Sequence, residues 1–118
     1  MREDDRVRVT HMIDAIESAL QFTNGREQPE MESEKKLLFA VVRAVEIIGE
    51  AASKVSPEGR AEAPNIPWGV IVGVRNRLAR AYFDVDPDIV WRTVTLALPP
   101  LLPPLSALLK STEPVAPS

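Results

Sequence analysis

The segment SEKKLLFAVVRAVEIIGEAASKV, residues 33–55, is the longest uninterrupted apolar pattern in the chain. Its apolar residues cover most of the circumference of a helix, so we expect this helix to be buried on several sides, within a bundle or at a subunit interface. Ser33 is a candidate N-cap. Ser56 and Pro57 end the helix, and Ser56 can cap a short turn that follows. The segment predicts a helical core for the protein.

Helical patterns flank this segment on both sides. Upstream, residues 5–20 carry apolar side chains at helical spacing, and Gly25 follows as part of a stop signal. The polar residues 26–32 predict a loop. Downstream, Pro67 suits the first position of a helix that runs to about Tyr82.

The last third of the chain is apolar but rich in proline. Asp86 is a candidate N-cap for a helix that begins at Pro87. Proline pairs at 99–100 and 103–104 remove backbone donors, so we expect a break there, followed by a short helix that ends at Lys110.

Length and composition indicate one compact domain, with 118 residues of which 45% are apolar and 26% charged. No segment alternates as a strand does. Residues 5–110 therefore predict a single all-α bundle of four main helices plus a short, proline-broken C-terminal helix, and residues 111–118 predict a disordered tail. The apolar stretches look too short or too proline-interrupted to span a membrane, and no secretory leader is visible, which favours a cytoplasmic protein without a membrane partner.

The chain contains no Cys and a single His, at position 11. Disulfides, Cys nucleophiles and thiolate or multi-histidine metal sites are therefore excluded, and we expect neither metal nor cofactor. Only a carboxylate Mg²⁺ site at Glu46 and Glu50 stays open, and an ion network of these residues with Arg43 is the simpler interpretation. The net charge of −3 argues against a protein that coats nucleic acid, but it allows a local basic patch.

The densest cluster of chemistry-capable residues is RNRLARAY, residues 75–82. Helical spacing groups Arg75 with Tyr82 on one side and Asn76 with Arg80 on another. Arginine clamps phosphate through its planar fork, Asn orients it, and Tyr stacks or donates. From spacing alone, these residues could equally be structural ion pairs, solvated charges, a helix-end amide and a half-buried aromatic.

Several linked motifs resemble the HepT-like toxins of the HEPN superfamily. They are RxxEIIGEA at 43–51, IPW at 66–68, RNxL at 75–78, YFxVD at 82–86, DIVW at 88–91 and LP at 98–99. The resemblance implies a HEPN-type helical bundle, a homodimer with two motifs facing each other across a cleft, and metal-independent endoribonuclease activity. It also implies a partner, a nucleotidyltransferase antitoxin of a type VII-like system that transfers AMP from ATP to the motif Tyr, here Tyr82.

One motif position departs from the family pattern. Arg75 matches the motif Arg and Tyr82 the motif Tyr, but Arg80 stands where the family carries His. Metal-free cleavage of RNA needs one group to take the proton of the 2′-OH and another to protonate the 5′-O leaving group, and Arg cannot act as a base. The resemblance implies a catalytic set of Arg75, Asn76, Arg80 and Tyr82, with RNA contacts from Arg75, Arg77 and Arg80. We therefore predict a chain that binds RNA but is catalytically impaired.

The notable residues outside the motif are expected to have structural rather than catalytic roles. His11 borders an amphipathic stripe and is expected to be an ordinary surface or half-buried residue rather than a substitute catalyst. Trp68 and Trp91 are expected to be core or interface anchors. The alternative function is a non-catalytic interaction module that binds a nucleotidyltransferase, RNA or a nucleotide, and Arg80 is the residue that favours it.

Overall fold

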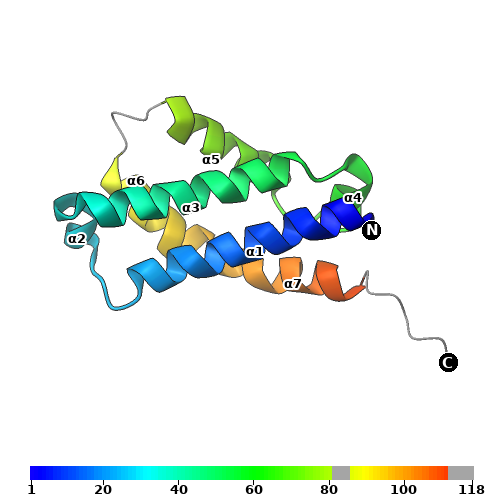
Figure 1. Ribbon diagram of the computed structural model, residues 1–118, viewed down its shortest axis with the longest axis horizontal. Helices are drawn as coiled ribbons and strands as arrows, with labels where there is room; N and C mark the ends of the chain where they lie inside the picture. Colours follow the sequence, from blue (N-terminus) through cyan, green and yellow to red (C-terminus); the bar gives the residue numbers. More distant parts are fainter. Residues whose placement is uncertain (81–85, 112–118) are drawn as a thin grey trace.

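The computed structural model of the chain describes residues 1–80 and 86–111, with side chains for residues 1–74 and 86–110. The described part is helical and contains no strand (Figure 1). Its elements are α1 (Glu3–Thr23), α2 (Gln28–Ser33), α3 (Lys35–Ser53), α4 (Pro57–Ala61), α5 (Trp68–Arg80), α6 (Pro87–Arg92), the π-helical turn η1 (Thr93–Ala97), the 3-10 turn η2 (Pro99–Leu101) and α7 (Leu102–Ser111). The all-α prediction is confirmed.

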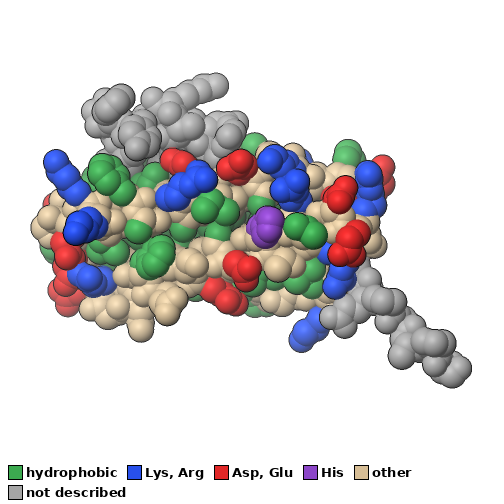
Figure 2. Space-filling model, viewed as in Figure 1, with side chains coloured by type: hydrophobic (Ala, Val, Ile, Leu, Met, Phe, Trp, Pro, Cys, Tyr) green, Lys and Arg blue, Asp and Glu red, His purple; other side chains and the backbone are tan. Residues whose placement is uncertain are grey.

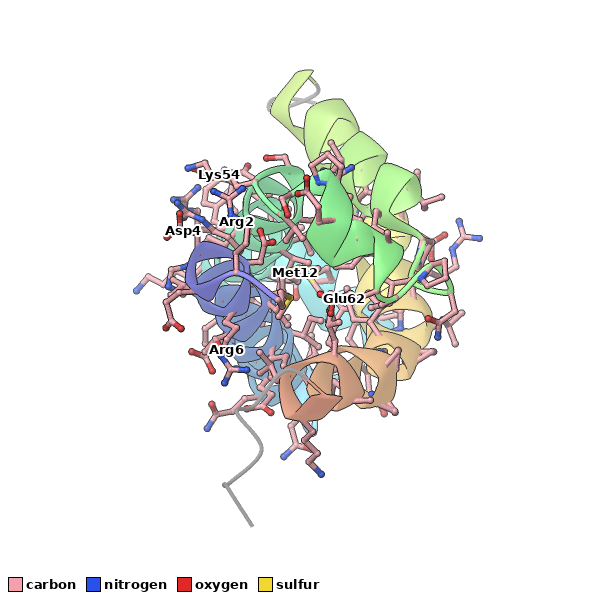
Figure 3. All side chains as sticks on the ribbon, turned by 90° about the vertical axis from the view of Figure 1, so that its right-hand side faces the viewer. Arg2, Asp4, Arg6, Met12, Lys54 and Glu62 are labelled. Atoms are coloured by element: carbon pink, nitrogen blue, oxygen red, sulfur yellow. The ribbon has the colours of Figure 1, made fainter. Side chains whose placement is uncertain are left out.

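The central helix is α3, which packs against α1 on one side and α5 on the other (Figure 1). Its buried residues Val41, Val45 and Ile48 meet an apolar stripe on α1 that includes Met12, whose side chain points into the interior (Figure 3). The neighbours within the same chain therefore account for the apolar circumference that the sequence of α3 displays.

The prediction of a loop over residues 26–32 is wrong, because α2 forms there. Pro29 fits the first turn of a helix, where its missing N–H needs no partner. Met31 is fully buried, and α2 lies against α6, so tertiary packing overrides a polar local composition. Ser33 ends α2, and the residue that precedes α3 as its cap is Glu34 rather than Ser33.

The regular α-helix is interrupted near the proline pairs, as predicted, because the π-helical turn η1 and the 3-10 turn η2 separate α6 from α7. The backbone nevertheless stays helical from α6 into α7. In the π turn, the Leu98 N–H donates to the Thr93 carbonyl, five residues back, at 3.0 Å. A wider turn leaves room for the prolines at 99–100, whose rings would clash with the preceding turn of a regular α-helix. The prolines at 103–104 lie in the first turn of α7, where no backbone donor is required.

This continuous run, Pro87–Lys110, is the one described helix that is long and apolar enough to cross a membrane by length and composition alone. The finding corrects the expectation that prolines interrupt every such stretch. Within the run, 28% of the most apolar window is buried in the protein. The buried residues join the core of the bundle; they are Val90, Val94, Leu98, Leu101, Leu105 and Leu108.

A buried carboxylate joins the start of α1 to the corner between α3 and α4. Asp5 is only 2% exposed, and it accepts hydrogen bonds from the Ser56 backbone N–H at 2.8 Å and from the Ser56 hydroxyl. Ser56 caps α4 as predicted, since its hydroxyl oxygen accepts from the Gly59 N–H at 3.1 Å. A Cβ at Gly59 would lie 2.7 Å from Asp5 Oδ2, so only glycine leaves this corner unstrained.

Two arginines tie helix ends to other parts of the bundle. Arg60 donates from Nε to the Val55 carbonyl at 3.2 Å and from Nη2 to the Ala52 carbonyl at 3.0 Å, which satisfies acceptors at the C-terminal end of α3. Arg6 donates from Nη1 to the Leu109 carbonyl at 3.1 Å and connects α1 to α7. Ser111 ends α7, and the rest of the expected disordered tail, residues 112–118, lies outside the described residues.

Candidate functional site

The candidate motif lies at the C-terminal end of α5. Residues 75–80 continue the helix as far as Arg80, so Asn76 and Arg80 are one helical turn apart. Tyr82, the expected site of modification, lies outside the described residues. Helical backbone through Arg80 confirms the predicted element that carries Arg75, Asn76 and Arg77.

The start of α5 is held firmly, and this fixes the direction of the helix that carries the motif. Trp68 is buried and donates from Nε1 to the Ala63 carbonyl at 3.1 Å, as expected for a core anchor. The helix begins at Trp68, one residue later than predicted, and the Pro67 carbonyl accepts the N–H of Ile71 at 3.0 Å. The buried Ile71 then packs α5 into the core.

The helix that follows the motif in sequence, α6, begins with a side-chain cap. The Asp86 carboxylate accepts the Asp88 N–H at 2.9 Å, and Pro87 occupies the first turn of α6, so this predicted helix start is confirmed. Trp91 is half-buried and packs against the core, again as an anchor. In sequence, Tyr82 thus lies between α5, whose first half packs against the core, and the capped start of α6.

Three cations share the end of the described part of α5. Arg75, Arg77 and Arg80 all fall within its last six described residues. Guanidinium groups present the planar donor forks that suit phosphate.

The single imidazole of the chain is not on this helix. His11 is exposed on α1, whereas the motif is on α5, and these two helices pack against opposite sides of α3 (Figure 1). Within one chain the structure therefore keeps His11 apart from the motif. It lies instead at a groove of about 210 Å³ between α1 and α3.

The acidic residues of α3 form ion pairs along their own helix. Arg43 Nη1 lies 3.3 Å from Glu46 Oε2, and Lys54 Nζ lies 3.9 Å from Glu50 Oε1. Arg43 and Glu46 are paired as the network interpretation predicts, while Glu50 is paired with Lys54 instead. Among the described residues no group of three or more His, Asp or Glu side chains could hold a metal ion.

A second group of charges lies beside α2. A hydrogen bond from Arg26 to Glu30 and the nearby Glu34 carboxylate raise the pKa of Arg26 above its ordinary value. All three side chains are exposed, so solvent screens the pairs and their contribution to stability is small.

An apolar groove runs beside the first half of α5. It encloses about 80 Å³ and is lined by α3, α5, η1 and neighbouring residues: Val45, Ile48, Pro67, Val70, Ile71, Val74, Thr93, Ala97, Leu98 and Leu101. Among its lining residues, Val70 is 65% exposed. No sequence pattern indicates this groove, because it depends on η1 lying next to α5.

Comparison with known proteins now identifies the family. The model of the family described as "Ribonuclease HepT-like" matches residues 12–108, which is most of the chain. The chain belongs to the HepT-like ribonuclease family. The predicted resemblance is therefore confirmed, and the helical bundle with its motif on α5 is a ribonuclease-type scaffold.

Individual relatives agree with this family. "Putative RNase MJ1380" of Methanocaldococcus jannaschii is 37% identical over 91 residues, which cover 75% of this chain and 84% of the relative. "Probable ribonuclease HepT" of Thermococcus cleftensis is 35% identical over 101 residues, which cover 86% of this HepT-like chain and 92% of the relative. No solved structure matches the chain.

Proposed function

We propose that this HepT-like chain is the toxin component of a type VII-like toxin–antitoxin pair, a metal-independent endoribonuclease scaffold whose motif has lost its proton-transfer group. Arg75 and Asn76 bind and orient the scissile phosphate, and Arg77 and Arg80 add positive charge for the RNA backbone. Tyr82 is the residue that the antitoxin modifies. The RNA substrate is single-stranded or loop RNA of the kind found in tRNA or mRNA.

The observation that carries the proposed impairment is the position of the only imidazole. His11 is on α1, across α3 from the motif helix, and Arg80 fills the position where the family keeps its His. Cleavage requires a proton to leave the 2′-OH as its oxygen attacks phosphorus, and a proton to reach the departing 5′-oxygen. Arg80 stays protonated and can stabilise the phosphorane charge, but it cannot take the first proton.

AMP transfer to Tyr82 gives a test that does not depend on cleavage. Incubation of the chain with its nucleotidyltransferase partner and ATP should increase its intact mass by one or more adenylate groups. Attached AMP would neutralise the chain, because it places charge and bulk where RNA must bind. The Tyr82→Phe variant should gain none, since it lacks the accepting oxygen. Equal labelling of both chains, or tight binding without any mass gain, would contradict the assignment of Tyr82.

We further propose that the working unit is a homodimer formed across the apolar groove beside α5. Val70, which lines this groove, is exposed, and α5 carries both this surface and the motif, so a second copy seated there would bring two motifs to one cleft. The apolar pattern of α3 does not support dimerisation, because α1 and α5 of the same chain bury it.

Light scattering at several protein concentrations tests this dimer. The parent chain should have the mass of two copies, and Val70→Glu should shift the protein toward a monomer because it buries a charge in the proposed interface. Val7→Glu is the matched control, since Val7 is also exposed but lies on α1. A parent chain that stays monomeric at all concentrations would rule out a composite site.

The second candidate function is the non-catalytic interaction module, and Arg80 is the observation that favours it. Such a module would bind its nucleotidyltransferase partner without being adenylylated. The mass measurement therefore separates the two functions.

A further inference from the structure

The surface formed by α1 and α3 carries charged and aromatic side chains that lie outside the motif at residues 75–82. Along α3 and its C-cap, one side of the helix carries residues at helical spacing: Phe39, Arg43, Glu46, Glu50 and Lys54. The groove of about 210 Å³ joins this stripe to Arg8 and His11 on α1. Figure 2 shows basic and acidic side chains around the purple imidazole on this face, and α1 and α3 pack against each other here.

The cations of this groove are incompletely neutralised. Arg8 has no ion-pair or hydrogen-bond partner among the described residues, and Lys54 meets Glu50 only at 3.9 Å. Arg43 is paired with Glu46 at 3.3 Å, but its side chain stays 63% exposed. Arg2 and Lys54 also project from the same side of the molecule, with Asp4 nearby (Figure 3). The groove is therefore lined by three cations and one carboxylate, a local positive excess in a chain of net charge −3.

Exposed aromatic side chains occur at the other end of the same pair of helices. Phe39, near the start of α3, is 56% exposed, and Phe22, near the end of α1, is 42% exposed. The two helices run antiparallel, so these ends lie together (Figure 1). Aromatic faces beside a basic groove are the combination that single-stranded nucleic acid requires, because bases stack on the rings while phosphates meet the cations.

We propose that the α1/α3 face, defined by Arg8, His11, Phe22, Phe39, Arg43 and Lys54, is a second RNA-binding surface that takes single-stranded RNA. This inference rests on the proposed function, because it assigns where the RNA lies before it reaches the motif. Exposed rings, an unpaired Arg8 and a loosely paired Lys54 favour RNA over a protein partner, since phosphates satisfy both cations without requiring a matching acidic surface.

The direction of α5 connects this face with the motif. Because α3 and α5 run antiparallel, the Phe39 end of α3 and the C-terminal end of α5 lie at the same end of the bundle (Figure 1). From Phe39 to Lys54 the stripe is about 22 Å long at 1.5 Å per residue. RNA that follows the stripe from the basic groove to the aromatic end therefore approaches residues 75–80.

Binding of a fluorescein-labelled unstructured RNA to the full chain, measured at several salt concentrations, tests the face. The Arg8→Ala/Lys54→Ala variant should bind on the order of tenfold more weakly, and its log–log salt slope should be smaller in magnitude by about 1.4, because each lost phosphate contact removes about 0.7. The matched control is Arg92→Ala/Lys110→Ala, which removes the same charge from two exposed positions on other helices. This control should bind as the parent does.

The aromatic contribution has its own matched pair. Phe39→Ala should weaken RNA binding on the order of tenfold through lost base stacking, whereas Ile89→Ala, which removes another half-exposed apolar side chain, should not. Circular dichroism of every variant establishes that each one is folded.

The possible outcomes separate this inference from the proposed function. Equal losses in the two double variants would overturn the inference, because overall charge would explain the binding. Unchanged RNA binding together with loss of the nucleotidyltransferase complex would also overturn it and would make the face a protein interface. Selective loss in the face variants supports it, even if the Arg80→His variant fails to cleave RNA, a result that would contradict the proposed function alone.

Discussion

The Arg80→His variant is expected to cleave single-stranded RNA about 10²–10⁴-fold faster than the parent chain, the range that a positioned general acid or base contributes. Arg80 is the last described residue of α5, one helical turn beyond Asn76, so the new imidazole would belong to the same helix as the residues proposed to bind phosphate. The measurement is single-turnover cleavage of a labelled tRNA pool with metal chelated. A variant rate equal to the parent's would show that the missing imidazole is not the cause of impairment.

Two further variants identify the source of any activity that is restored. Arg80→Gln removes the charge of Arg80 without supplying a base, so it should not gain activity. The double variant His11→Asn/Arg80→His should keep the gain, because His11 lies on α1, across α3 from the motif. If replacing His11 abolished the gain, that residue would have to act at the motif, contrary to its place in the fold.

The Asp5→Ala variant is expected to lose about 2–4 kcal/mol of unfolding free energy, the largest effect on stability that we predict for a polar residue. Asp5 is buried and accepts from the N–H and the hydroxyl of Ser56. Hydrogen bonds to a charged group contribute about 1.5–3 kcal/mol each, and the half-buried Ser56 donors would lose their acceptor. Chemical denaturation, with the midpoint and slope fitted together, measures the change.

Asp4→Ala is the matched control for this prediction. Asp4 precedes Asp5 in the first turn of α1 and has the same favourable position relative to the helix dipole, but it is exposed. Its removal should cost no more than about 1 kcal/mol. Equal losses in the two variants would show that the helix dipole, rather than the buried contact with Ser56, explains the effect of Asp5.

The parts of the fold that follow from local pattern are predicted well. Residues 33–55 predict α3 because apolar residues that recur at helical spacing over such a length fit no structure other than a helix. Asp86 and Pro87 predict the start of α6 because the cap involves only residues that are adjacent in sequence. The corner at Asp5 was not predicted, since its partner Ser56 is 51 residues away in the chain. The single apolar residue of α2, Met31, gives too weak a pattern to indicate a helix.

In the candidate site too, features within one segment are predicted and features assembled from distant helices are not. The residues at 75–82 were found because linked motifs resemble a family, and the match over residues 12–108 confirms that family. The apolar groove and the α1/α3 face were not found, since each is assembled from helices that are distant in sequence. The π turn that creates one wall of the apolar groove depends on how the backbone accommodates the prolines at 99–100, which composition alone does not reveal.

The pH dependence of RNA cleavage by the parent chain and by Arg80→His tests most directly the claim that this HepT-like scaffold lacks only its proton-transfer group. The variant's rate should change with an apparent pKa near that of a free imidazole, about 6.5, because one protonation state of the new side chain is the active one. The parent's rate, where it is measurable, should show no such titration. Identical pH profiles for the two chains would contradict the account.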